Sequence, residues 1–302
     1  AEPAVPVLKS LRWQIAFALF AVYVIWGSTY VAMAIGVRHF PPYLMGGMRY
    51  TAAGLAIFLV LLLRGERWPD RRVWAAALLT GILLLTVGNG AVNQAITHVS
   101  SGLAALVIAS SSLFAALFAR FWGDPVSRRE WAGIAVGFSG VALLAARTEL
   151  RADLFALALL VGASASWALG SIWSRHLPQA SSTWMASATQ LLCGGAGMLA
   201  IALLRGEQMP AAVPAEGWLA LAYLAVFGAV IAFSAYAFLL KNTRPALATS
   251  TAYVNPVIAV ALGALLLAEP VTGAELLAML LVLAGVVLVT TGRSGAGDKS
   301  EA

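Results

Sequence analysis

Ten stretches of about 20 predominantly apolar residues follow one another along this chain, and they limit its fold more than any other feature. A helix of about 20 apolar residues is long enough to cross the hydrocarbon core of a bilayer. The chain is also only 11% charged, whereas an ordinary soluble domain carries about 25% charged residues. We therefore predict an all-α integral membrane protein with ten transmembrane helices. The predicted spans are residues 13–36, 43–63, 73–94, 102–121, 129–146, 152–174, 182–204, 216–239, 246–267 and 272–290.

The Lys and Arg residues are distributed unevenly between the two sides of these spans. The N-terminal segment, the loops after spans 2, 4, 6 and 8 and the C-terminal segment hold 14 of them, and the other loops hold 4. Because Lys and Arg concentrate on the cytoplasmic side of membrane proteins, we expect both termini in the cytoplasm. The net charge of +6 then reflects orientation, and no nucleic-acid partner is expected. The first ten residues lack an apolar core, so we expect no signal peptide.

The sequence repeats itself with a shift of about half its length. Residues 124–127 (DPVS) match residues 269–272 (EPVT), and Glu130 matches Glu275, both with a shift of 145 residues. A hydroxyl residue followed three positions later by Glu is typical of a capping box at the start of a helix. We interpret Glu269 as part of this structural turn.

Further matches extend the repeat over both halves of the chain. Trp26 matches Trp167, and LRGE occurs at residues 63–66 and 204–207, both with a shift of 141 residues. Each copy contains an odd number of spans, so the second copy enters the membrane from the opposite side. We predict two five-helix inverted-topology repeats with a disordered tail, an arrangement typical of alternating-access transporters. Their bounds are residues 1–150 for spans 1–5, 151–295 for spans 6–10 and 296–302 for the tail.

Several motifs resemble a known family over about residues 13–290. They are WGSTYVAM in the first span, MRYTAAG in the second, and LLLAEPVTGAE followed by LAGVVLV near the end. Together they resemble the drug/metabolite transporter superfamily, EamA type, and within it the YddG-type exporters of aromatic amino acids, which also handle lipophilic cations. The resemblance implies a bacterial inner-membrane exporter that holds its substrate in a cavity between the two halves.

The predicted span centres contain no acidic residue and no His, which is relevant to how transport would be driven. All 13 Asp and Glu residues lie at span ends, in loops or in the tails, and the 3 His residues lie in loops. Proton-coupled carriers commonly place such a group inside the membrane. The phosphate-binding pattern GxxxxGK[ST] is also missing. We expect no cofactor, metal or ATP drive and transport down the substrate gradient, although coupling through a loop residue remains an alternative.

Aromatic residues near span centres are candidates for the walls of a substrate cavity. Trp26 and Trp167 lie near the centres of spans 1 and 6, and Tyr236 and Tyr253 lie in spans 8 and 9. Such rings can stack on a flat substrate or face a cation. The alternative is that they are large packing residues.

Uncharged polar residues near mid-membrane are candidates for binding the polar groups of the substrate. Asn89 and Asn93 lie in span 3, Ser111 lies in span 4, and Asn255 precedes Pro256 in span 9. A proline removes a backbone donor and frees a carbonyl, and carriers use such breaks at substrate sites. The alternative for each is a role in helix–helix contact.

Arg49 is the basic residue furthest inside a predicted span, about 9 Å from its outer end at 1.5 Å per residue. It is a candidate for contact with a substrate carboxylate or for an outer gate. At this depth the side chain is within snorkelling range of the surface. The alternative is a structural Arg that bonds to carbonyls or waters.

Together with the family resemblance, these patterns predict an exporter of small aromatic or neutral and zwitterionic metabolites, with aromatic amino acids foremost. The resemblance implies a location in the cell inner membrane. One alternative is efflux of lipophilic cations or drugs. A different class is a passive channel or a membrane-embedded enzyme, but an enzyme usually needs clustered Asp, His or Glu, so we expect no enzymatic activity. The expected partners are a small-molecule substrate and the lipid bilayer. The sequence leaves the oligomeric state open and is compatible with a monomer.

Overall fold

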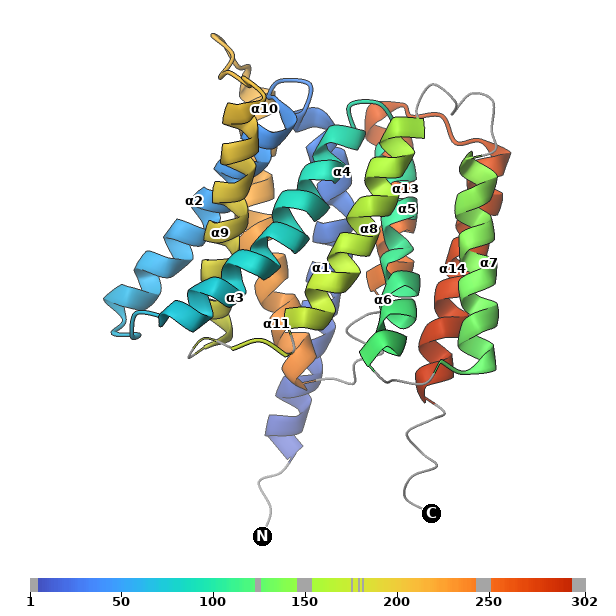
Figure 1. The fold of residues 1–302 in the computed structure, drawn as a ribbon, viewed down its shortest axis with the longest axis horizontal. Helices are drawn as coiled ribbons and strands as arrows, with labels where there is room; N and C mark the ends of the chain where they lie inside the picture. Colours follow the sequence, from blue (N-terminus) through green and yellow to red (C-terminus); the bar gives the residue numbers. More distant parts are fainter. Residues whose placement is uncertain are drawn as a thin grey trace.

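In a computed structural model, the protein is a bundle of long helices (Figure 1). The structure describes residues 5–122, 126–145, 154–174, 176–178, 180, 182–242 and 251–294. Within these residues there is no β-strand. The helices of the first half are α1 (Val5–Gly36), α2 (Pro42–Leu63), α3 (Arg71–Gly81), η1 (Ile82–Asn89), α4 (Gly90–Ala95), α5 (Ser101–Ala109), α6 (Ser111–Ala119), η2 (Arg120–Trp122) and α7 (Arg128–Ala145). Those of the second half are α8 (Leu154–Ser174), α9 (Thr183–Leu204), α10 (Ala215–Tyr223), η4 (Leu224–Ala232), α11 (Phe233–Asn242), α13 (Thr251–Leu267) and α14 (Gly273–Ser294).

These helices form ten spans among the described residues, which confirms the predicted fold class of two five-helix repeats. The elements α3, η1 and α4 form one span, α5 and α6 another, and α10, η4 and α11 a third. In the part of the chain that the structure describes, seven helices are long and apolar enough to cross a membrane. Two shorter apolar helices (Val254–Leu267 and Gly273–Val289) and α7 complete the set. The predicted first residues of span 9, 246–250, lie outside the described residues.

The first residue of α1 and the last residue of α14 lie at the same end of the bundle (Figure 1). We call this the terminal end. The opposite end, which we call the distal end, holds the α1–α2, α9–α10 and α13–α14 connections (Figure 1). The arrangement follows from the even number of spans, since each span crosses the bundle once.

The two repeated capping boxes are confirmed. The Ser127 amide donates to Glu130 Oε2 (2.7 Å), and the Glu130 amide donates back to Ser127 Oγ (3.2 Å). In the second half, the Thr272 amide donates to Glu275 Oε2 (2.8 Å), and the Glu275 amide donates to Thr272 Oγ1 (3.2 Å). Two backbone donors at each helix start thereby find partners. Asp124 lies outside the described residues.

Irregular helical segments interrupt several spans at mid-depth, which the sequence did not predict. The third span of each half contains a π-helix, η1 in the first and η4 in the second. Span 4 breaks between α5 and α6 at Ser110, whose Oγ donates to the Val107 carbonyl at 2.6 Å. Ser164 Oγ of the second half donates to the same carbonyl at 3.1 Å. Such irregular turns occur frequently at functional sites.

Helices at equivalent positions in the two repeats pack directly on each other. The α2–α9 pair lies at one edge of the bundle and the α7–α14 pair at the other (Figure 1). Glycines allow these backbones to approach. A Cβ atom built on Gly54 of α2 would lie 2.9 Å from the Leu192 amide nitrogen, and one on Gly285 of α14 would lie 2.6 Å from the Gly133 carbonyl oxygen of α7. Small residues therefore define both contacts.

The repeated LRGE segments tie the α2–α9 pair together at its two ends. Gly65 and Gly206 adopt φ values of +84° and +68°, which favour glycine. After the first turn, Glu66 Oε2 accepts from Ser182 Oγ at the start of α9 (2.8 Å). After the second, Glu207 Oε2 accepts from the Leu44 amide in the first turn of α2 (2.8 Å). The glutamate of each tetrapeptide thus accepts a hydrogen bond from the other helix of the pair, at opposite ends of the bundle.

Candidate substrate cavity

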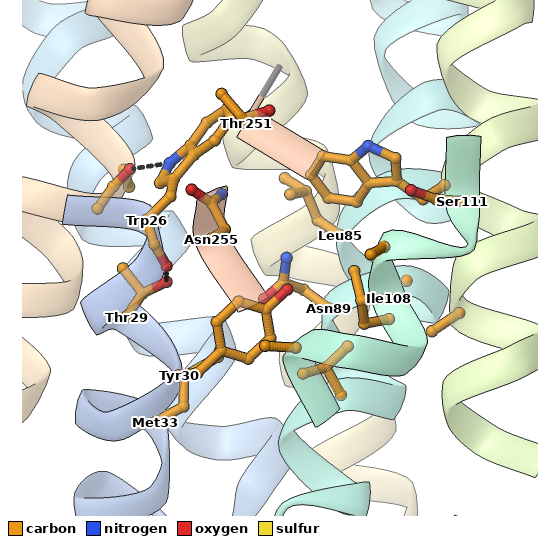
Figure 2. A pocket seen from close by; sticks show the side chains of 18 of the residues that line it. Trp26, Thr29, Tyr30, Met33, Leu85, Asn89, Ile108, Ser111, Thr251 and Asn255 are labelled. Atoms are coloured by element: carbon orange, nitrogen blue, oxygen red, sulfur yellow. Dashed lines mark hydrogen bonds between the residues drawn. The ribbon is translucent and has the colours of Figure 1, made fainter. Parts of the chain in front are cut away.

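A cavity of about 170 Å³ lies between the two halves of the protein (Figure 2). Its lining comes from α1, α2, η1, α4, α5 and α6 of the first half and from α8, η4, α11 and α13 of the second. Six of the sequence candidates line it, namely Trp26, Arg49, Asn89, Ser111, Trp167 and Asn255. Both halves therefore contribute to one cavity.

Trp26 of α1 forms one wall of the cavity. Its indole Nε1 donates a hydrogen bond to the Gly228 carbonyl of η4 (3.2 Å), drawn as a dashed line in Figure 2. Its ring packs on Tyr236 of α11, with the ring centroids 5.0 Å apart. A residue of the first half thereby binds the π-helix of the second half.

Tyr236, another sequence candidate, is not among the residues that line this cavity. Its ring belongs to a small core with Val22 and Leu239 behind Trp26. Phe233, nearly one helical turn earlier, takes the place facing the cavity. Tyr236 therefore supports the wall instead of forming it.

Trp167 of α8 repeats this arrangement in the other half. A Cβ atom built on Gly88 of η1 would lie 3.5 Å from Trp167 Cε3, so the indole lies against this glycine. The neighbouring Ser166 Oγ donates to the Leu83 carbonyl of η1 at 2.7 Å. Each tryptophan thus packs against a π-helix of the opposite repeat.

Asn255 of α13 places an amide in the cavity beside Trp26 and opposite Asn89 (Figure 2). Pro256 follows it inside the helix. The Asn255 Oδ1 atom is buried and accepts no hydrogen bond from the described residues. It is therefore free to accept one from a bound molecule. The side chain of Tyr253, another sequence candidate, lies outside the described residues.

Arg49 of α2 is buried at the cavity instead of snorkelling to the surface, with only 5% of it exposed. Its guanidinium lies over the Tyr50 ring, 4.3 Å from the centroid, and its Nη2 donates to the Tyr50 hydroxyl. The Nε and Nη1 atoms are buried and have no partner among the described residues. A buried cation without a counter-charge is costly, so this group is suited to bind an anionic group.

Asn93, another sequence candidate, is not among the residues that line this cavity. It is fully buried in α4, and its Nδ2 donates to the Pro42 carbonyl at the start of α2 (3.2 Å). A Cβ atom on Gly46 of α2 would lie 2.7 Å from this Nδ2 atom. Four residues after Asn89, the Asn93 side chain therefore lies in the contact between α4 and α2.

Several residues that line the cavity were not singled out from the sequence. Tyr30 lies one helical turn after Trp26, and this i, i+4 spacing could have revealed it. Among the described lining residues, Arg49 is the single charged side chain. The missed residues include Thr29, Tyr30, Met33, Tyr50, Phe233 and Thr251.

Comparison with known proteins identifies a family. The model of the EamA-like transporter family matches residues 13–146 and 154–291. The inner membrane transporter YedA of Escherichia coli (strain K12) is 43% identical over 277 residues, which cover 91% of this chain and 90% of YedA. A Salmonella typhimurium (strain LT2) protein named "Probable amino-acid metabolite efflux pump" is 28% identical over 90% of this chain and 93% of that protein. One solved crystal structure shares the fold, with a TM-score of 0.63 and 23% identity over 92% of this chain and 96% of that one.

Proposed function

This chain belongs to the EamA-like transporter family, and from that premise we propose that it exports small aromatic or zwitterionic metabolites, aromatic amino acids foremost, by alternating access. The two repeats, divided near residue 150, would exchange conformations around the shared cavity. The excess of Lys and Arg at the terminal end supports a cytoplasmic location for both termini. The distal end then faces the outside of the inner membrane.

The observation that supports this substrate class is the presence of both unpartnered hydrogen-bond donors and an unpartnered acceptor in one aromatic cavity. Arg49 presents buried, unpartnered N–H groups, and Asn255 presents a buried, unpartnered oxygen. A zwitterion answers both, because its carboxylate accepts from Arg49 and its ammonium donates to Asn255. The aromatic ring of the substrate would lie between the indoles of Trp26 and Trp167. The name of the Salmonella relative supports the same class.

Arg49 also argues against lipophilic cations as the main substrates. Aromatic walls attract a delocalised cation, but a guanidinium in the same low-dielectric cavity repels it. The described lining holds no Asp or Glu to offset that repulsion. We propose that the concentration gradient of the substrate itself drives transport.

Counterflow in proteoliposomes tests this function. Vesicles loaded with unlabelled tryptophan should take up labelled tryptophan saturably and faster than empty vesicles. Linear uptake without trans-stimulation would identify a channel, and preference for a quaternary bipyridinium over tryptophan would identify a cation exporter. Either result would overturn the proposal.

A further inference from the structure

Glu269, in the turn between α13 and α14, binds the start of α5 in the opposite half of the protein. Its Oε1 accepts from the Ser101 amide (2.9 Å), and its Oε2 accepts from Ser101 Oγ (2.8 Å) and the Gly102 amide (3.4 Å). A carboxylate is well placed at a helix N-terminus, where backbone amides are unpaired and the helix dipole is positive. We call this contact between Glu269 and Ser101–Gly102 the distal clasp.

Local capping does not explain the distal clasp. Thr272 and Glu275 already cap α14 by themselves. Ala268, just before Glu269, has φ +52°, which is uncommon for a residue with a side chain. Such a conformation persists where surrounding contacts hold it and is frequent at switch regions. The turn thus places the Glu269 carboxylate between Gly263 of α13 and the start of α5 in the other repeat.

Close helix packing lies directly beneath the distal clasp. A Cβ atom on Gly263 of α13 would collide with Glu269 Oε2 and lie 2.8 Å from Ser101 Oγ. One on Gly102 would lie 3.1 Å from the Val260 Cα atom. Helices α5 and α13 therefore touch through their backbones here, and the carboxylate fits only because residue 263 has no side chain.

The distal clasp lies between the cavity and the distal surface. Ala105 of α5 lines the cavity and lies four residues after Ser101, about 6 Å along the helix. On α13, Pro256 lines the cavity, and Val260 lies one turn further towards the distal end. The α5–α13 contact and the distal clasp therefore lie between these lining residues and the distal end.

We propose that Glu269 is the latch of the distal gate, and that substrate leaves on this side only after its contact with Ser101 and Gly102 breaks. The inference rests on the alternating access proposed above. It assigns to the turn at Glu269 a positioning role in transport, because Glu269 lies outside the cavity and acts through α5. On the proposed orientation, this gate opens to the outside.

Labelling of a cysteine in the cavity tests the latch without any substrate. Cys193 is the single cysteine of the chain, so Cys193→Ala with Ala105→Cys gives one reporter thiol behind the distal clasp. Intact cells would be treated with a membrane-impermeant maleimide, and inverted vesicles with the same reagent. We expect Glu269→Ala to speed labelling from the outside about tenfold, as loss of a hydrogen bond to a charged group implies.

Two further variants separate a latch from general damage to the turn. Gly263→Ala keeps both partners but forces them apart, so it should speed labelling to a similar extent. Glu275→Ala is the matched control, because Glu275 caps α14 from the same turn and bonds to Thr272. It should leave the labelling rate unchanged. If Glu269→Ala proves unfolded, Ser101→Ala replaces it and should raise the rate by a smaller factor.

Equal labelling rates in Glu269→Ala, Gly263→Ala and Glu275→Ala, all with parental unfolding temperatures, would overturn the latch. So would rapid labelling of the parent from outside, since the gate would then be open. Faster labelling in inverted vesicles alone would refute the outward location of the gate. None of these results depends on which molecule is transported, so failure of the proposed substrate class is seen separately, in the counterflow assay.

Discussion

The indole nitrogen of Trp26 lies 3.2 Å from the carbonyl oxygen of Gly228 and donates a hydrogen bond to it across 202 residues of sequence. At the equivalent place in the other repeat, Trp167 lies against Gly88. Each cavity wall is therefore built from a tryptophan of one repeat and a π-helix of the other. Movement of either repeat must alter both walls.

The contribution of the Trp26 hydrogen bond to stability should be measurable by comparison with Trp167, the equivalent residue of the other repeat. Trp26→Phe and Trp167→Phe remove similar ring volume, but only Trp26 donates a hydrogen bond through its indole in the described structure. We expect Trp26→Phe to lower the free energy of unfolding by about 1 kcal/mol more than Trp167→Phe does, the usual net worth of one hydrogen bond. Denaturant unfolding in detergent measures this difference. Equal losses would show that the Gly228 contact adds nothing.

Arg49 should matter to transport more than to stability. Its Nε and Nη1 atoms lack partners among the described residues, so Arg49→Met removes an uncompensated buried charge. We expect its unfolding temperature to equal or exceed that of the parent, while tryptophan counterflow falls at least about tenfold, the loss of one charge-assisted bond. Counterflow of tryptamine, which lacks the carboxylate, should fall much less in this variant. A variant that loses stability and transports both compounds equally would mark Arg49 as structural.

The sequence predicts the spans well because a bilayer demands long apolar stretches. The capping boxes at Ser127 and Thr272 are equally local, since each involves residues three positions apart. The π-helices that begin at Ile82 and Leu224 bond to side chains of the other repeat, and no local sequence pattern predicted them. Membrane depth can therefore be read from sequence, but irregular turns at that depth cannot.

The candidate site shows the same limit. Depth and polarity were enough to select Asn89 and Asn255, which do line the cavity. They could not separate Asn89 from Asn93, because the choice depends on which face of α4 meets Pro42. The partner of Glu269 lies 168 residues away, so its carboxylate looked like part of a local turn. Helix rotation and long-range partners are set by tertiary packing.

The two hydrogen-bonded contacts at the ends of the α2–α9 pair should contribute independently to the free energy of unfolding. Ser182 accepts from the Met185 amide and donates to Glu66, so Ser182→Ala should cost about 1 kcal/mol. Glu207→Ala removes the acceptor of the Leu44 amide and should cost about 1–2 kcal/mol. The two sites lie at opposite ends of α2, roughly 33 Å apart for 22 residues. The double variant should therefore lose the sum of both costs to within about 0.5 kcal/mol, and a clear departure in denaturant unfolding would reveal coupling along the pair.

Glycine replacement should have opposite effects in two helices of the same bundle. In α14, a methyl group on Gly285 would lie 2.6 Å from the Gly133 carbonyl oxygen and the Gly137 Cα atom. Because both are backbone atoms of α7, they cannot rotate away, and Gly285→Ala should destabilise the protein by about 1–3 kcal/mol. In α8, a methyl group on Gly162 would meet nothing within 4 Å. Gly162→Ala should therefore stabilise by about 0.5–1 kcal/mol, the helix preference of Ala over Gly. Thermal unfolding of both variants in the same detergent checks the signs, and a neutral Gly285→Ala would mean that α7 and α14 are less closely packed than the structure shows.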